Sequence, residues 1–380
     1  MAPNRADLAI VGAGILGLAH AWAAAKAGKQ VIVFERSPKA SGASVRNFGM
    51  IWPIGQPSGE LLQLALRSRI LWRDLLREAR LPLRETGSLH LTYRPDEVAV
   101  AQEFAALAPA LGYECQWLSA AQVLGRSHAV QPNGLLGALW SPTEFTIDPR
   151  QILAELPGFL TERYGVRFLF STAVRAIEPP ALEIATGRWE AEQFLVCSGE
   201  DFETLYPSHY ASSGLTRCKL QMLRTAPQPP QWELGPSLAA GLTLRFYPSF
   251  EVCTTLATLK QRIAEETPAL DKWRIHALVS QTTDGALTLG DSHEYGLAVD
   301  IFNKAEIDDL ILDYTRGFLR APSLQIAERW HGVYAKHPDK TLLTMQPETG
   351  VQIVASPGGS GMTLSMGLGE KTIQEIGWRV

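Results

Sequence analysis

Residues 7–17 read Asp7-Leu-Ala-Ile-Val-Gly-Ala-Gly-Ile-Leu-Gly17, an apolar run that leads directly into the pattern GxGxxG. The run predicts a short buried strand, and the Ala- and Leu-rich stretch over 15–27 has the spacing of a helix. Gly28 would end that helix, and a β-branched run over 30–34 predicts a second strand, which Glu35 closes. The beginning of the chain therefore predicts a strand, a turn, a helix and another strand.

The glycines of this turn, Gly12, Gly14 and Gly17, have the spacing of a dinucleotide-binding fingerprint. They permit a tight turn, close approach of the backbone to a pyrophosphate and close helix packing, and the helix N-terminus offers unpaired N–H groups to the phosphates. Glu35 can accept hydrogen bonds from the ribose hydroxyls and disfavours a 2′-phosphate, so NADP is not expected. The alternative is a glycine-rich turn that binds nothing. The fingerprint leaves NAD and FAD open.

Composition narrows the class of protein. The 380 residues suffice for about two or three domains, and 46% hydrophobic with 19% charged residues is a globular composition. A formal charge of -4 argues against nucleic acid as a partner, because phosphate backbones need a concentrated basic face. The nearly uncharged stretch over 8–25 could be mistaken for a membrane anchor, but the periodic glycines explain it, and no membrane partner is expected.

The cysteines, Cys115, Cys197, Cys218 and Cys253, form no CxxC motif and no Cys/His cluster. Neither a disulfide framework nor a zinc site is therefore expected, and no metal is predicted. A reducing, cytoplasmic location fits this cysteine usage best.

Helices and strands alternate along the rest of the chain, with strands dominating after residue 214. Helices are expected over 58–79, 97–111, 149–164, 306–319 and 361–378, and strands over 87–93, 134–140, 165–170, 181–197, 215–225, 242–247, 251–256, 275–281, 286–290 and 352–355.

Four segments, in order, resemble the family of D-amino-acid oxidase, glycine oxidase and sarcosine oxidase, which are FAD-dependent oxidoreductases. They are Ser41–Ile51, Asp148–Ile177, Phe194–Gly199 and Gly358–Leu364. The resemblance covers nearly the whole chain and implies an α/β and α+β fold. A Rossmann-like FAD-binding domain of the glutathione-reductase type would comprise residues 1–85, 146–214 and 326–380, and an antiparallel-sheet substrate domain would comprise residues 86–145 and 215–325.

The fingerprint and the resemblance together assign a set of residues to FAD. These are Gly12, Ala13, Gly14, Ile15, Leu16, Gly17, Glu35, Arg36, Ser44, Arg46, Asn47, Phe48, Gly49, Met50, Val174, Ser198, Gly199, Gly332, Gly359, Ser360, Gly361, Met362 and Thr363. The amides over 361–363, at a predicted helix N-terminus, could stabilise negative charge on reduced flavin. Gly332 stands where sarcosine oxidases attach flavin through a cysteine, so the resemblance implies FAD held without a covalent bond.

Two positions depart from these relatives. Tyr334 stands where the relatives carry the arginine that pairs with a substrate carboxylate, and Thr363 stands where sarcosine oxidases carry a lysine. An ordinary α-amino acid or sarcosine is therefore not the expected substrate. The candidate substrate-site residues are Tyr334, Arg46, Lys219, His331 and Lys336, with Gln221 and His337 beside them. Each has a simpler interpretation, as a pyrophosphate ligand, a core side chain or a solvated turn residue.

The resemblance implies oxidation of a small primary or secondary amine, hydrolysis of the imine in water and dioxygen as electron acceptor, with another acceptor as the alternative. Three segments, Gly49–Pro53, Val196–Glu203 and Arg329–Tyr334, also resemble a subgroup associated with phosphonate breakdown. The expected substrate is thus an aminophosphonate, such as 2-aminoethylphosphonate or its N-methyl form, which gives phosphonoacetaldehyde. The alternatives are a flavoenzyme acting on an amino acid, hydroxy acid or polyol, and an NAD-binding dehydrogenase or non-catalytic dinucleotide-binding module.

Overall fold

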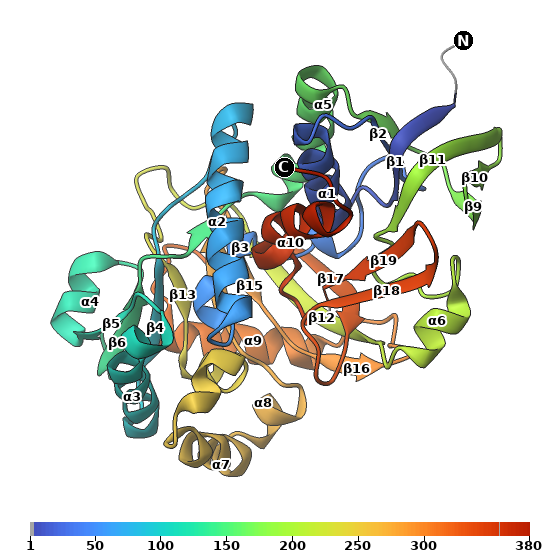
Figure 1. Ribbon diagram of the computed structural model, residues 1–380. Coiled ribbons are helices and arrows are strands. Elements are labelled where there is room, and N and C mark those ends of the chain that lie inside the picture. Colours follow the sequence, from blue (N-terminus) through green and yellow to red (C-terminus); the bar gives the residue numbers. More distant parts are fainter. Residues whose placement is uncertain (1–3, 357) are drawn as a thin grey trace.

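Two large sheets organise the chain (Figure 1), and the computed structural model describes residues 4–356 and 358–380. Sheet I has parallel pairings at its centre, where β1 lies between β2 and β11. Its strands, in spatial order, are β18 (Leu343–Glu348), β19 (Val351–Ala355), β11 (Gly187–Val196), β1 (Arg5–Val11), β2 (Val31–Phe34) and β8 (Arg167–Leu169), and β9 (Val174–Glu178) and β10 (Ala181–Ile184) extend it. Strand β2 and the carboxyl-terminal parts of β1 and β11 are apolar because both faces of the sheet are covered there.

Sheet II is mainly antiparallel, with one parallel pair between β13 and β4. Its strands, in order, are β16 (Glu294–Gly296), β12 (Thr216–Thr225), β15 (Leu287–Gly290), β14 (Leu278–Gln281), β13 (Ser237–Ala239), β4 (Ser88–Thr92), β6 (Gly137–Ser141) and β5 (Gln116–Ser119), and β17 (Ile326–Lys336) pairs with β12. A two-stranded pair, β3 (Met50–Ile51) with β7 (Phe145–Thr146), completes the strands of the described residues.

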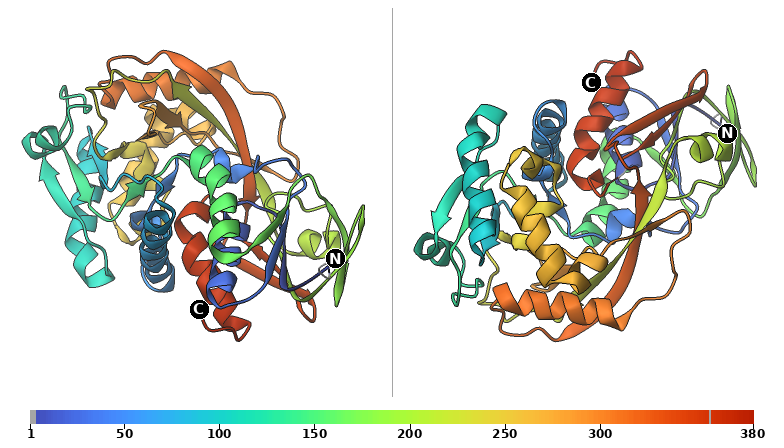
Figure 2. Two further views of the ribbon diagram at one scale, coloured as in Figure 1. Left: turned by 90° about the horizontal axis from the view of Figure 1, so that it is seen from above. Right: turned by 90° about the horizontal axis from the view of Figure 1, so that it is seen from below.

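The helices cover the sheets and connect them. Their bounds are α1 (Ile15–Lys26), α2 (Glu60–Ala79), α3 (Pro95–Leu111), α4 (Ala120–Arg126), α5 (Pro149–Tyr164), α6 (Pro207–Ser212), α7 (Leu256–Glu266), α8 (Pro268–Lys272), α9 (Ala305–Phe318) and α10 (Gly361–Glu375), with short 3-10 helices η1 (Ala43–Val45), η2 (Pro53–Gly55), η3 (Gly241–Arg245) and η4 (Pro248–Val252). Both views in Figure 2 place the teal segment of α3 to β6 and the green β9–β11 hairpin at opposite ends of the molecule.

Helix α10 packs tightly between α1 and α2 (Figure 1). Glycines make this possible: a Cβ atom at Gly369 would lie 2.8 Å from the backbone of Ala19, and one at Gly367 would lie 2.8 Å from the carbonyl oxygen of Leu64. The last helix is thereby fixed beside the first, which brings the Gly358–Leu364 loop to the carboxyl end of β1.

Most of the expected helices and strands lie within a few residues of their predicted bounds, but two of the predicted strands are wrong. Residues 242–247 and 251–256, expected as strands, form η3, η4 and the start of α7. The buried residues of this region, Leu256, Leu259 and Ile263, are spaced by three and four, which is the period of a helix face. The apolar runs were too short to reveal that period.

The division into five domain segments remains a proposal. Strand β17 pairs with β12 along its length, so residues 326–336 lie in sheet II, whereas β18 and β19 lie in sheet I. This pairing indicates that the last domain boundary would follow Lys336 instead of preceding residue 326. Among residues 4–356 and 358–380, no helix has both the length and the hydropathy needed to cross a bilayer.

Candidate active site

A cavity of about 950 Å³ extends from the β1–α1 turn to sheet II. One end is lined by the turn itself, by Glu35 at the end of β2 and by the loop that follows β11. The other end is lined by side chains of sheet II and by the aromatic residues Phe246 and Tyr247, which precede η4. Because parallel strands present their carboxyl ends at one edge, the first end is where a doubly wound sheet binds a nucleotide.

The turn after β1 packs closely against the loop that follows β11 and leads into a helix N-terminus without a side-chain cap. Gly12 has a φ of +101°, and a Cβ atom there would lie 2.5 Å from the carbonyl oxygen of Cys197. Helix α1 begins with Gly14 at its N-cap, so no side chain of its own caps it, and the amide of Ile15 donates instead to Oγ of Ser44 at 2.9 Å. The turn therefore presents backbone amides and positive potential to the cavity.

The acid at the end of β2 is held against this turn. Oε2 of Glu35 accepts a hydrogen bond of 3.0 Å from the amide of Ala13, and Oε1 accepts one of 2.9 Å from the amide of Ser37. Arg36 pairs with Asp201 at 2.6 Å across the mouth of the same end. The carboxylate is thus oriented with lone pairs left for ribose hydroxyls.

Most residues predicted to bind the cofactor line this cavity. They are Gly12, Gly14, Ile15, Leu16, Glu35, Arg36, Ser44, Arg46, Asn47, Phe48, Met50, Val174, Ser198, Gly199, Gly332, Gly359, Ser360, Gly361, Met362 and Thr363. Three others, Ala13, Gly17 and Gly49, stand behind the wall. Gly17 faces the carbonyl of Gly12 and Gly49 faces that of Ile147, at distances too short for any Cβ atom, so both shape the loops that line the cavity.

The glycine-rich loop before α10 forms another part of the wall. The hydroxyl of Thr363 accepts a hydrogen bond of 2.9 Å from the amide of Trp52, and the carbonyl of Met362 accepts one of 2.8 Å from the indole of Trp72. These bonds anchor the first turn of α10 to the β3–η2 segment. Among the described residues, no side chain caps α10 at Ser360, so the amides of its first turn can meet an anionic group.

The paired strands β12 and β17 present one face to the cavity. Leu220 lies opposite Gly332 and Cys218 lies opposite Tyr334 in the register, and Leu220, Gly332 and Tyr334 line the cavity. Surroundings withdrawn from bulk water raise the pKa of the Tyr334 phenol well above its ordinary value. The phenol therefore stays protonated and can donate a hydrogen bond into the cavity.

Two predicted site residues, Lys219 and Gln221, lie on the opposite face, so their placement near the cofactor is wrong. Side chains alternate along a strand, and their neighbours in β12 are the ones that line the cavity. Lys219 is fully buried, contacts the carbonyl of Phe302 and lies 3.7 Å from Glu294. Gln221 donates to Asp308 at 2.8 Å. Both residues bind the segment that leads into α9.

Of the remaining candidate residues, some lie in the cavity wall and one lies on the outer face of β17. His331 is also on the outer face, where its Nδ1 lies 2.9 Å from the side-chain oxygen of Asn303, so its predicted role in the site is wrong. Arg46, Lys336 and His337 line the cavity, and their role at the substrate stays a prediction. Arg46 donates to the carbonyl of His331 at 3.2 Å, which holds the arginine across β17.

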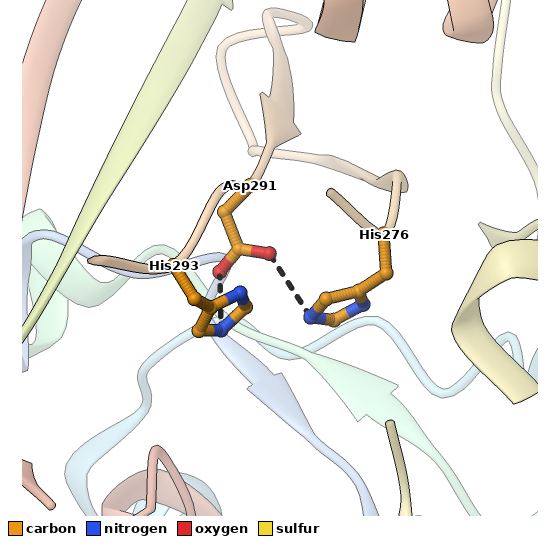
Figure 3. Close-up of side chains that lie close together, drawn as sticks. All are labelled: His276, Asp291 and His293. Atoms are coloured by element: carbon orange, nitrogen blue, oxygen red, sulfur yellow. Dashed lines mark ion pairs between the residues drawn. The ribbon is translucent and has the colours of Figure 1, made fainter. Parts of the chain in front are cut away.

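Three buried residues of the cavity wall were not predicted from the sequence. They are His276, Asp291 and His293, which we call the His-Asp-His cluster. Nε2 of His276 lies 3.1 Å from Oδ1 of Asp291, and Nε2 of His293 lies 3.9 Å from Oδ2 (Figure 3). Burial lowers the pKa of His276 well below its ordinary value, lowers that of His293 to about 4 and raises that of Asp291 well above its usual range. The pattern Asp-Ser-His after a strand was the only sequence signal.

One end of the cavity is a turn of the kind that binds dinucleotides, and the other end is a polar and aromatic wall that suits a small molecule. Together they indicate a dinucleotide-dependent oxidoreductase. The chain belongs to the DAO family of FAD dependent oxidoreductases, whose model matches residues 7–375. Glycine oxidase from Geobacillus kaustophilus (strain HTA426) is 27% identical over 208 residues, which are 52% of this chain and 55% of that enzyme. The chain thus matches about half the length of this relative.

Solved structures share the whole fold. The crystal structure of glycine oxidase from Geobacillus kaustophilus has a TM-score of 0.77 and 20% identity, and the match covers 99% of this chain and 95% of that one. L-alpha-glycerophosphate oxidase from Mycoplasma pneumoniae, with FAD bound, has a TM-score of 0.75 and 15% identity, with the same coverage of 99% and 95%. The expected Rossmann-like fold with a second sheet is confirmed.

The cavity residues fit FAD, the cofactor of the family. The N-terminus of α1, which Gly14 leaves without a side-chain cap, offers amides to a pyrophosphate, Glu35 is oriented for a ribose, and the first turn of α10 offers amides at another part of the cavity wall. When bound, FAD supplies the two-electron oxidising chemistry. The family assignment confirms the expected cofactor and favours it over NAD.

Proposed function

We propose that the protein oxidises a small amine that carries a phosphonate group, such as 2-aminoethylphosphonate or its N-methyl form, to phosphonoacetaldehyde. The observation that carries this proposal is the presence of two cationic side chains, Arg46 and Lys336, in the cavity wall. Burial is the main cause of the lowered pKa of His293 in the same wall, and positive charge from Lys336, Arg274 and Arg245 adds to it. A doubly charged anion suits several cations better than a single carboxylate does.

The walls of this end would bind the amine part of the substrate. Trp52, Phe246 and Tyr247 line it with aromatic surface, which excludes water, and the phenol of Tyr334 can donate a hydrogen bond. Nearby positive charge lowers the pKa of a bound ammonium group, so the substrate would lose a proton more easily and present a neutral amine. A neutral amine is the form that can be oxidised, and the product imine hydrolyses in water to the aldehyde.

A flavin-bleaching screen without oxygen tests the substrate. The FAD-loaded protein would be mixed with 2-aminoethylphosphonate, its N-methyl form, the carboxylate analogue β-alanine, glycine, sarcosine and 2-hydroxyethylphosphonate. We expect the two aminophosphonates to bleach the flavin fastest. Faster bleaching by glycine, sarcosine or the hydroxy analogue would contradict the proposal, and the hydroxy analogue would point to the hydroxy acid alternative.

A charge variant tests the role given to the cations. Lys336→Met should raise KM for the aminophosphonate by about tenfold or more, since a hydrogen bond to a charged group contributes about 1.5–3 kcal/mol. Lys371→Met, an exposed change on α10, is the matched control and should leave KM unchanged. An equal KM for the two variants would remove Lys336 from the substrate site.

Electron acceptor, covalent state and location remain proposals with simple tests. Admitting air to the bleached enzyme should restore the yellow colour and release peroxide if dioxygen is the acceptor. Acid precipitation should release all the flavin into the supernatant if FAD is held without a covalent bond, as Gly332 implies. Cell fractionation would test the cytoplasmic location that the cysteine usage favours.

A further inference from the structure

We infer that the His-Asp-His cluster binds one divalent transition-metal ion, with open coordination positions that face the cavity. Imidazole and carboxylate atoms of all three residues lie within 4.8 Å of one another. Figure 3 shows the Asp291 carboxylate directed between the two imidazole rings. His276, Asp291 and His293 are all more than nine-tenths buried, and all three line the cavity.

The backbone holds the three side chains in place. His276 precedes β14, and Asp291 and His293 follow β15, which is the antiparallel neighbour of β14. Beyond the last register pair, Leu278 with Gly290, the backbones of His276 and Asp291 exchange two hydrogen bonds of 3.0 and 3.3 Å. The cluster therefore stands on a rigid strand end, which is what a metal site needs for fixed ligand geometry.

Inside the cluster, Nε2 of His293 and the carboxylate of Asp291 face one another, and the hydrogen bond at Nδ1 of His293 makes its Nε2 an acceptor. Nδ1 of His293 lies 3.1 Å from the carbonyl oxygen of Arg274, which can only accept, so Nδ1 carries the proton. Nε2 of a neutral ring then presents a lone pair, and it faces the Asp291 carboxylate. Oδ1 of Asp291 lies 3.1 Å from Nε2 of His276, but within residues 4–356 and 358–380 it makes no hydrogen bond of good geometry. Either a shared proton or a metal ion satisfies these atoms, and metal titration distinguishes the two.

The ligand set selects the kind of ion. Imidazole nitrogens with one carboxylate suit zinc, iron, cobalt or nickel better than magnesium or calcium, which prefer oxygen ligands. A ring N–H donated to a backbone carbonyl, as in His293, is the usual outer contact of a metal-bound histidine. Three protein ligands leave positions open for water or a substrate.

The surroundings of the cluster are aromatic and cationic. Phe246 stacks on both rings, with centroid distances of 4.3 Å to His276 and 5.4 Å to His293. Arg245 is paired with Asp271 at 3.3 Å, which offsets much of its charge. A metal ion here would add positive charge to the end of the cavity that Lys336 already lines, and its open positions would take an oxyanion. That role as anchor rests on the proposed function, whereas the metal site does not.

Metal titration of the FAD-loaded protein tests the site without any substrate. After treatment with a chelator and dialysis, calorimetric titration with Zn²⁺ should show one equivalent bound per chain. Co²⁺ should give d–d absorption at wavelengths longer than those of the flavin. A folded holoenzyme that takes up no saturable equivalent of either ion overturns the inference.

Variants locate the ion. His293→Ala and Asp291→Asn should weaken Zn²⁺ binding by more than about 100-fold, since loss of an outer contact alone costs roughly 10–100-fold. His128→Ala, an exposed histidine away from the cavity, is the control and should bind as the wild type does. FAD content and circular dichroism identify a variant that fails to fold, and Asp291→Asn preserves the shape of the side chain. Unchanged Zn²⁺ affinity in both folded variants would refute the site.

The two proposals fail separately. If Zn²⁺ binds as expected but no aminophosphonate bleaches the flavin, the metal site stands and the proposed substrate falls. If metal-free enzyme oxidises the aminophosphonate with unchanged KM, the function stands and the anchoring role of the metal falls.

Discussion

The amide of Ala13 donates a hydrogen bond of 3.0 Å to Oε2 of Glu35, which joins the turn after β1 to the end of β2. Oε1 of the same carboxylate accepts from Ser37, so each oxygen keeps one lone pair for a ligand. These contacts within the protein fix the orientation of the acid. The cost of orienting the side chain therefore falls on folding and not on cofactor binding.

Glu35→Gln should weaken FAD binding by about 10–100-fold, because a hydrogen bond to a charged group contributes about 1.5–3 kcal/mol. The amide nitrogen of glutamine cannot accept, so one of the two oriented oxygens is lost. Quenching of flavin fluorescence during titration of the apoprotein measures the affinity. Glu183→Gln, an exposed change on β10, is the control. Equal affinities for the two variants would show that Glu35 does not contact the ribose.

Gly12→Ala should abolish retention of FAD. The position combines a φ of +101° with a Cβ atom 2.5 Å from the carbonyl oxygen of Cys197, so β1 and β11 would have to separate. Gly28→Ala is a matched control, because Gly28 has a φ of +76° but a Cβ there meets nothing within 4 Å. The control should lose only about 1 kcal/mol of stability from backbone strain. The ratio of flavin to protein absorbance and the Tm compare the two, and equal flavin retention would contradict the prediction.

The dinucleotide end of the cavity could be predicted from the sequence because its information is local. Strand, glycine spacing, helix and terminal acid all lie within residues 7–35, and each constrains the backbone directly. The structure then brings Gly12, Ser44, Glu35 and the loop at Gly358 to one cavity, as the family resemblance implied.

The substrate end could not be predicted because its information is not local. Both faces of β12 are buried, so the sequence did not indicate that Leu220 faces the cavity and Lys219 faces away. The His-Asp-His cluster forms only through the pairing of β14 with β15, which joins residues 15 and 17 positions apart. The sequence pattern of one segment does not show which other strand it will pair with.

Because the imidazole of His90 is buried, the protein should lose stability in mild acid. It is fully buried in the core of sheet II, and burial lowers its pKa to about 3, against about 6.5 in an unfolded chain. Between these values the unfolded chain binds more protons, so stability is present above pH 6.5 and is lost as pH falls toward 3.

His90→Leu removes this dependence. Between pH 6.5 and 5 the free energy of unfolding should fall by about 1.6 kcal/mol less in the variant than in the wild type. Urea unfolding at the two pH values measures the difference, with His128→Leu as an exposed control. Parallel losses of stability in wild type and His90→Leu would mean that the buried imidazole is not the titrating group.

Lys219→Met tests whether the outer face of β12 contributes to stability but not to catalysis. Lys219 is fully buried on the outer face, where it contacts the carbonyl of Phe302 and lies near Glu294. Methionine keeps the apolar length of the side chain, and Glu294 keeps its ion pair of 2.7 Å with Lys304. We expect a loss of about 1–3 kcal/mol in stability, because a buried acceptor loses its donor. FAD content and substrate KM should stay within about twofold of wild type. The side chain of Lys219 does not line the cavity, so its loss should change the free energy of ligand binding by less than about 0.5 kcal/mol. Substrate oxidation that disappears while the Tm holds would place Lys219 in the active site after all.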